Sequence, residues 1–293
     1  VRSEAFAHDR QIKAWGVYSQ APDGIILGTS RASVGLNPDH SGWTAEHAYN
    51  AAVTASTPYY AYRYFQHANA VVPTRELVLA LDFGSFSPSL DGFSTFDESI
   101  LKVQVSGDPT PGFLLLTAAK NLYSLTVSKY SVSTLLENRL PKYREQDPAA
   151  YVPQFSSAGI MQPDTFLVQR WLPLRQRAYG TLSQYVMTLW DEPDEFLLLG
   201  DDGVESSGFY WYRMLLREAY ADNVQVHLFF NPSHAYILEA LMAKGLWDIW
   251  EDWKIMIAAI NEEEAARAGK EPFPLLDFSG YNRFTTETIP NLA

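Results

Sequence analysis

The first apolar segment of the chain ends in a serine whose neighbours in the sequence are those expected around a nucleophile. Residues 25–27 form a short apolar run typical of a buried parallel strand, and Gly28, Thr29 and Ser30 end it. Glycine lets the backbone turn sharply there, which displays Ser30 at the carboxyl end of the strand, where ligands bind in open α/β sheets. Such a serine is a nucleophile if a base reaches its hydroxyl. The alternative is that Thr29 and Ser30 only cap the segment that follows.

Polar residues also follow the other four predicted strands. They are Asn50 near the end of the second strand, Asp82 after the third, Asn231-Pro232-Ser233-His234 after the fourth, and Asp277 after the fifth. Because the carboxyl ends of parallel strands meet at one edge of a sheet, we expect these groups to lie close to the serine. Acyl transfer needs a nucleophile, a base, a group that orients the base and donors for the oxyanion. All these residue types are present.

His234 is the candidate base. Of the six histidines, it alone directly follows a predicted buried strand and precedes a predicted helix. A neutral imidazole at that point can take the proton of Ser30. The alternative is that Ser233 caps the next helix while His234 packs or bonds locally. Asp277 either orients the imidazole or bonds the backbone amides of its own turn.

Four further residues are candidates for oxyanion or substrate binding: Arg31, Asn50, Asp82 and Asn231. Asn50 is either an oxyanion donor or an asparagine that bonds the backbone. An acid at the tip of an apolar strand is costly unless it is paired, so Asp82 either belongs to the site or anchors the loop at Gly84. Arg31 holds either an anionic group of the substrate or an internal carboxylate.

An alternation of apolar runs and helical patterns positions these residues. The predicted strands are 25–27, 48–53, 77–81, 224–230 and 273–276, and the predicted helices are 4–15, 58–70, 209–220, 235–244 and 246–261. Five short buried strands separated mostly by helices indicate an α/β fold with a parallel sheet covered on both faces. Between residues 86 and 196 the alternation stops. We interpret this stretch as a largely helical insertion within a single domain of residues 1–293.

The composition excludes several classes of function. With 22 basic and 34 acidic residues the net charge is −12, which argues against nucleic acid as the main partner. The chain has no cysteine, so it has neither disulfides nor thiolate metal sites. Its histidines lack the spacing of metal ligands, and no glycine pattern that cradles phosphate follows a strand. No apolar run approaches the ~20 residues needed to cross a bilayer.

The motifs LGTSRASVGL, LALDF, FFNPSHA and LLDFSGYN resemble the SGNH/GDSL hydrolases. The similarity is to the cell-envelope branch, which includes alginate O-acetyltransferases, the proteins that D-alanylate teichoic acid, and an uncharacterised group linked to exopolysaccharide production. It covers most of the chain apart from the insertion. The resemblance implies a three-layer α/β/α sandwich and acyl hydrolysis or transfer by a Ser-His-Asp arrangement.

Two departures from the family pattern stand out. Thr29 occupies the place of the acid in the usual Gly-Asp-Ser block, as is common in the envelope branch. The late Asp-x-x-His block, which supplies the family's acid and base, has no counterpart, since no histidine follows Asp277. Either a carboxyl-terminal segment that carries it is absent from this chain, or His234 has taken over, or the protein does not catalyse. We expect missing residues there, and an amino-terminal anchor or signal that has been removed.

The leading hypothesis is a serine-dependent acyltransferase or esterase that acts on O-acyl groups of a cell-envelope or secreted polysaccharide. Ser30 attacks the ester, His234 and Asp277 serve as base and orienting acid, and the Ser30 amide and Asn50 stabilise the oxyanion. No cofactor is needed, because the acyl group arrives on a donor or a membrane-bound partner. The resemblance implies a periplasmic or other extracytoplasmic location. The rivals are an inactive relative that binds or scaffolds polysaccharide and a flavodoxin-like binder of small molecules.

Overall fold

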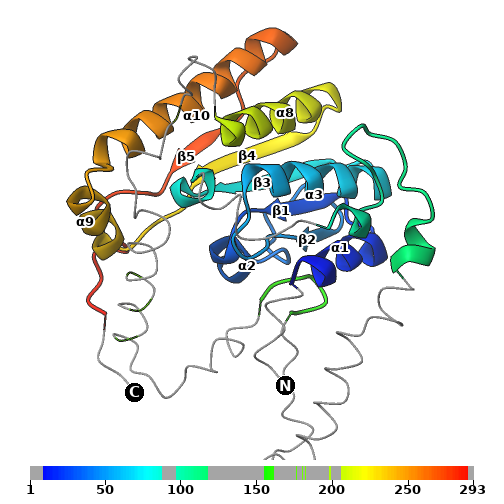
Figure 1. The fold of residues 1–293 in the computed structure, drawn as a ribbon, viewed down its shortest axis with the longest axis horizontal. Helices are drawn as coiled ribbons and strands as arrows, with labels where there is room; N and C mark the ends of the chain where they lie inside the picture. The colour runs from blue at the N-terminus through cyan, green and yellow to red at the C-terminus, as the bar shows by residue number, and fades with distance from the viewer. Residues whose placement is uncertain are drawn as a thin grey trace, which may run out of the picture.

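The computed structural model describes residues 9–87, 97–117, 155–161 and 206–289, together with residues 176, 180, 182 and 198. Five strands form one sheet (Figure 1). The strands are β1 (Gly24–Leu27), β2 (Ala48–Asn50), β3 (Glu76–Leu81), β4 (Gln225–Phe230) and β5 (Leu275–Asp277). The described helices are α1 (Asp9–Gln20), α2 (Ser30–Gly35), α3 (Pro58–Val71), α8 (Ser207–Ala221), α9 (Ala235–Ala243) and α10 (Trp247–Ala268), with short 3-10 turns η2 (Phe83–Phe86) and η4 (Glu98–Ile100).

All strand pairs in this sheet are parallel, in the order β2-β1-β3-β4-β5. The prediction of an α/β fold with a five-stranded parallel sheet is therefore confirmed. The strand order reverses between β1 and β3, and ligands bind at such switch points, outside the carboxyl ends of the strands. The register pairs Leu81 with Phe230, so Asp82 and Asn231 leave the sheet side by side.

The two faces of the sheet are covered unequally by the described residues. The main hydrophobic core lies on the face that packs against α1, α3, α8 and α10, and its strand residues include Leu27, Leu79 and Leu228. The other face carries a much smaller cluster beneath α2, including Ile26, Ala80 and Phe229. We expected helices on both faces. Within the described part of the chain, only the six-residue α2 supplies one on the second face.

The fifth strand differs from its prediction as a buried strand. β5 pairs with β4, but Leu276 is 55% exposed, and Asp277 is exposed as well. Leu276 stands opposite Phe229 in the register and thus lies on the sparsely covered face. An apolar run predicts burial only where another element packs over it, which explains the error.

Several element boundaries also moved. α10 continues to Ala268, seven residues beyond the predicted end, because Gly269, with φ +65°, stops it there. Gly245 ends α9 with φ +73°, as predicted for a C′ glycine. α1 begins at Asp9 and runs to Gln20, and residues 1–8 lie outside the described part. Most of the predicted insertion at 86–196 also lies outside it.

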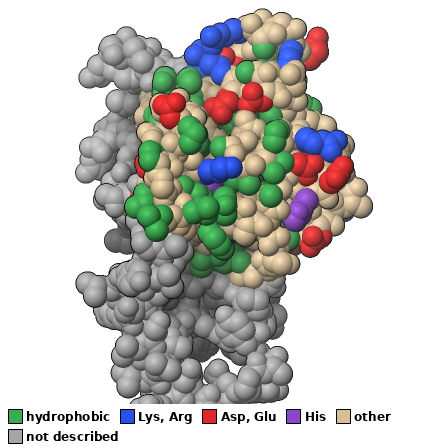
Figure 2. Space-filling model, turned by 90° about the vertical axis from the view of Figure 1, so that its right-hand side faces the viewer, with side chains coloured by type: hydrophobic (Ala, Val, Ile, Leu, Met, Phe, Trp, Pro, Cys, Tyr) green, Lys and Arg blue, Asp and Glu red, His purple; other side chains and the backbone are tan. Residues whose placement is uncertain are grey.

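The opposite, amino-terminal edge of the sheet faces the viewer in Figure 2. Basic side chains there lie beside acidic ones, and Arg75 forms ion pairs with Asp23 and Glu46. The hydrophobic side chains gather mainly in the lower left part of this face in Figure 2. In the portions of the chain that the structure describes, no helix combines the length and apolarity that a bilayer span requires.

Candidate functional site

Ser30 is the first residue of α2 and directly follows the turn that ends β1. Gly28 makes this turn with φ +147°, and a Cβ added there would lie 2.9 Å from the Cβ atoms of Ala32 and Ala80. A side chain at position 28 would therefore force the turn apart. Thr29 is the N-cap of α2, since its Oγ1 accepts a hydrogen bond from the backbone N–H of Arg31 (3.4 Å). The capping role falls to Thr29, which leaves the Ser30 hydroxyl for other uses.

Asp82 joins the ends of three strands. It is 4% exposed, and its Oδ2 accepts hydrogen bonds from Thr29 Oγ1 (2.5 Å) and Asn231 Nδ2 (2.8 Å). Its Oδ1 forms an ion pair with the guanidinium of Arg31. A buried carboxylate with these partners is well compensated. The structure thus brings Arg31, Asp82 and Asn231 together, next to Ser30.

Arg31 also connects Asp82 to the loop after β4 through hydrogen bonds. Its Nη1 donates to the carbonyl of Pro232 (3.0 Å) and to the hydroxyl of Ser233 (2.6 Å). Arg31 therefore pairs with an internal carboxylate, which is the second of the two roles expected for it. The pairing also cancels most of the charge at the edge of the sheet.

His234 is held by one local hydrogen bond and one long-range hydrogen bond. It is the N-cap of α9, where its Nδ1 accepts from the N–H of Tyr236 (3.2 Å). Nε2 then carries the proton and donates to the carbonyl of Glu287 (2.8 Å). Both nitrogens are therefore occupied in this conformation, although His234 lies in the wall of the same cleft as Ser30.

Asp277 is not paired with His234 in this structure. It accepts hydrogen bonds from the N–H (2.8 Å) and the hydroxyl (2.5 Å) of Ser279, and it forms an ion pair with Lys254. Burial alone would raise the pKa of Asp277, but the hydrogen bonds from Lys254 and Ser279 outweigh it and lower the pKa below its ordinary value. The turn-stabilising alternative therefore describes Asp277, and the expected orientation of the imidazole by this acid is absent from the geometry.

Asn50 is fully buried and faces α2, not the cleft. Its Nδ2 donates to the carbonyls of Ala32 and Leu36 (both 2.9 Å), and its Oδ1 accepts from the N–H of Ala52 (3.1 Å). Both amide hydrogens are used, so Asn50 has none left for an oxyanion. This matches the backbone-bonding alternative, and it corrects the expected oxyanion role.

A cleft of about 240 Å³ opens at the carboxyl ends of β3 and β4, where α9 and the first turns of α10 lie beyond the sheet (Figure 1). The polar residues that line it are Ser30, Arg31, Asp82, Asn231, Ser233, His234 and Ser279. The apolar residues of the lining, which we call the apolar wall, include Leu238, Leu241, Trp250 and Trp253. Trp250 and Trp253 also belong to the main hydrophobic core. Their i, i+3 spacing was the available signal that both lie on one side of α10.

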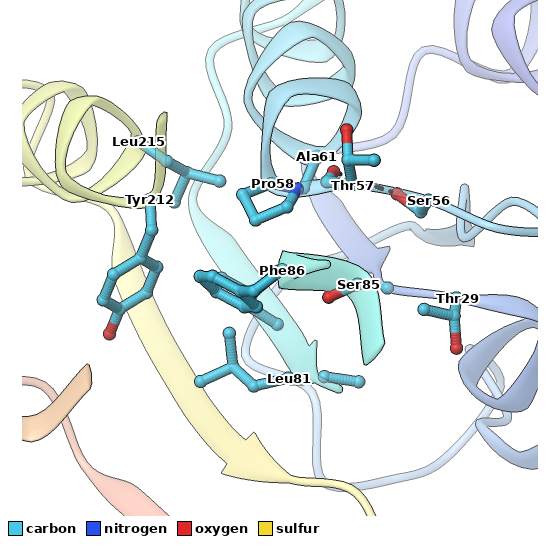
Figure 3. Close-up of a pocket in the computed structure, with 13 residues that line it drawn as sticks. Thr29, Ser56, Thr57, Pro58, Ala61, Leu81, Ser85, Phe86, Tyr212 and Leu215 are labelled. Carbon is cyan, nitrogen blue, oxygen red and sulfur yellow. Dashed lines mark hydrogen bonds between the residues drawn. The ribbon is translucent and has the colours of Figure 1, made fainter. Parts of the chain in front are cut away.

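A second, smaller cavity lies on the α3 and α8 side of the same edge (Figure 3). Its volume is about 20 Å³, and Thr29, Ser85, Phe86 and Tyr212 are among the residues around it. That space holds about one water molecule. The larger cleft is therefore the candidate site for a substrate.

Among the residues that the structure describes, no three or more His, Asp or Glu side chains form a group that could bind a metal ion. No family model matches the sequence, and no curated protein or solved structure matches it at a significant level. The function is therefore argued from the chemistry of the site and from the motifs.

Proposed function

We propose that this protein is a serine-dependent acyltransferase or esterase of the SGNH type, with Ser30 as the nucleophile. The observation that carries the proposal is the position of Ser30. It follows β1 at the switch point of a parallel sheet, and it opens onto the cleft beside Asp82 and Asn231. The envelope-type motifs support an O-acylated polysaccharide outside the cytoplasm as the substrate, and a three-layer sandwich as the complete fold.

The reaction follows from the groups around the serine. Ser30 Oγ attacks the acyl carbonyl carbon while a base removes the hydroxyl proton, and the carbonyl π electrons move to oxygen. The backbone N–H of Ser30, which has no acceptor within α2, is a donor for that oxyanion. Collapse of the intermediate breaks the ester C–O bond, and the base returns the proton to the leaving alkoxide. A water molecule or a sugar hydroxyl then takes the acyl group from Ser30.

His234 is the proposed base, and it needs a change of conformation. The hydrogen bond from the Tyr236 N–H to Nδ1 and the hydrogen bond from Nε2 to the Glu287 carbonyl must break before a ring nitrogen faces Ser30. Both are single hydrogen bonds at the surface end of α9, each worth about 1 kcal/mol net. Free enzymes often hold their catalytic hydrogen bonds loosely, so this cost is compatible with a working base.

The test is covalent labelling of Ser30. We expect a fluorophosphonate to label the wild-type protein, and p-nitrophenyl acetate to be hydrolysed above background. Ser30→Ala should abolish labelling and lower hydrolysis roughly 10³-fold or more. Ser19→Ala, which alters an exposed serine of α1, is the matched control and should leave both unchanged. Equal labelling of the Ser30→Ala and wild-type proteins would refute the nucleophile.

A second candidate is a binding protein that has lost catalysis. The observation in its favour is the engagement of both His234 nitrogens with Tyr236 and Glu287. This reading predicts no labelling of the wild-type protein, together with binding of an acylated polysaccharide that Ser30→Ala leaves unchanged. Affinity electrophoresis in gels that contain the polysaccharide measures that binding.

A further inference from the structure

The apolar wall of the cleft suits a hydrocarbon. It consists of Phe83, Ile237, Leu238, Leu241, Trp250 and Trp253. From this wall we infer that the acyl group of the substrate is a medium-length chain of about six to eight carbons, and not acetyl. This inference rests on the proposed function, because it assumes that the acyl carbonyl lies at Ser30.

The apolar wall lines the same cleft as Ser30. Leu238 and Leu241 come from α9, and Trp250 and Trp253 from α10, and all four are almost wholly buried. The Trp253 ring lies beside that of Phe230 at the end of β4, with 5.0 Å between the ring centroids. A carbonyl carbon at Ser30 would therefore have its alkyl chain directed toward side chains that favour a hydrocarbon over water.

The volume of the cleft suits a chain of this length. An apolar cavity of about 150 Å³ binds the six-carbon ligand benzene, and the cleft measures about 240 Å³. It therefore has room for an acyl chain of about six to eight carbons. The single methyl of an acetyl group would leave most of the apolar wall without contact. Each further methylene that is buried there should raise kcat/KM roughly fourfold until the space is full.

The charged side chains at the cleft are paired with one another. The cleft's cation, Arg31, is held by Asp82 across an ion pair, and nearby Lys254 is held by Asp277 in the same way. The charges at the polar side are thus balanced internally. A neutral ester fits such a site better than a phosphorylated or carboxylated ligand, which would have to compete with these carboxylates for the cations.

The experiment compares p-nitrophenyl esters from two to twelve carbons. We expect kcat/KM to rise from acetate to a maximum at six to eight carbons and to fall for longer chains. Leu241→Trp fills the apolar end of the cleft and should lower the octanoate-to-acetate ratio at least 30-fold. Met242→Trp introduces a tryptophan at the next position, which is 50% exposed, and should leave the ratio unchanged. Because Leu241 is buried, Ile237→Trp at the half-buried rim is a second variant in case the first does not fold.

A binding measurement separates this inference from the proposed function. 2-Nonanone mimics an octanoyl group without a leaving group, and acetone mimics acetyl. In the Ser30→Ala protein, 2-nonanone should change the fluorescence of the tryptophans in the cleft, and Leu241→Trp should weaken its binding at least tenfold. Ser30-dependent hydrolysis that is fastest with acetate, without binding of 2-nonanone, would overturn the medium-chain inference and leave the nucleophile intact. Binding of 2-nonanone without hydrolysis of any ester would support the acyl cleft and overturn the enzyme.

Discussion

Among single residues, Asp82 has the most direct influence on the geometry of the candidate site. Its carboxylate accepts hydrogen bonds from Thr29 at the end of β1 and from Asn231 at the end of β4. It also forms an ion pair with Arg31 in the first turn of α2. Each of these residues is a neighbour of Ser30 in sequence or in the cleft. The position of the serine hydroxyl therefore depends on one buried acid.

We expect Asp82→Asn to lower the free energy of unfolding by about 1–3 kcal/mol. Breaking a buried ion pair costs more when both partners are buried, but Arg31 is 34% exposed, so water compensates part of the loss. Chemical denaturation with urea measures the change. Asp108→Asn, at an exposed carboxylate that accepts from Ser106, is the control and should stay within about 0.5 kcal/mol. Equal effects of the two substitutions would contradict the anchoring role of Asp82.

At the scale of elements, two adjacent buried polar side chains position α2. Asn50 of β2 bonds the carbonyls of Ala32 and Leu36, and Lys13 of α1 reaches Ser33. The Nζ of Lys13 donates to Ser33 Oγ (3.1 Å), to the carbonyl of Asn50 (2.7 Å) and to the carbonyl of Gly159. One lysine thus connects α1, α2, β2 and the segment at 155–161.

Burial of Lys13 should make stability depend on pH. Burial lowers the pKa of this amine to about 7, and the charge of Asp9 only partly opposes the shift. Between pH 7 and about 10.5 the unfolded chain binds a proton that the folded chain lacks, so the free energy of unfolding rises with pH in that window, by at most about 1.4 kcal/mol per pH unit. The penalty of the buried charge is fully present below pH 7.

The measurement is urea denaturation between pH 6 and pH 10. Lys13→Met should remove this rise, whereas Lys270→Met, at an exposed lysine, should retain it. An unchanged pH profile in Lys13→Met would mean that Lys13 keeps its proton throughout, with the three acceptors outweighing burial.

At the scale of the whole molecule, the described core is one-sided. The large cluster lies between the sheet and α1, α3, α8 and α10, while the other face has the small cluster beneath α2. The two faces of the same sheet should therefore differ strongly in their contribution to stability.

Two leucine truncations test this difference. Leu79→Ala, on β3 within the large cluster, should lower the free energy of unfolding by about 2–5 kcal/mol because it leaves a cavity. Leu276→Ala, on β5 at 55% exposure, should change it by less than about 0.5 kcal/mol. Thermal or urea unfolding compares the two. A comparable loss in both would indicate that another element covers the second face.

Local sequence patterns predicted strands and helix ends well where a segment is almost wholly apolar or where a glycine ends a helix. The apolar runs at 25–27 and 77–81 became β1 and β3, and the glycine at 245 ended a helix, because burial and backbone conformation are encoded nearby. The same reasoning placed Ser30, Arg31, Asp82 and Asn231 at one edge. Patterns were less informative for His234 and Asp277, since partners for a polar side chain come from any part of the chain.

The amino-acid sequence by itself determined the parallel α/β class and the set of polar residues at the strand ends, because strand direction follows from the alternation with helices. Only the tertiary structure decided the strand order, the bond between His234 and a carbonyl 53 residues away, and the apolar wall that α9 and α10 contribute to the cleft at Ser30. These features depend on how distant elements pack. Packing is a property of the assembled chain, and the periodicity of a single segment does not contain it.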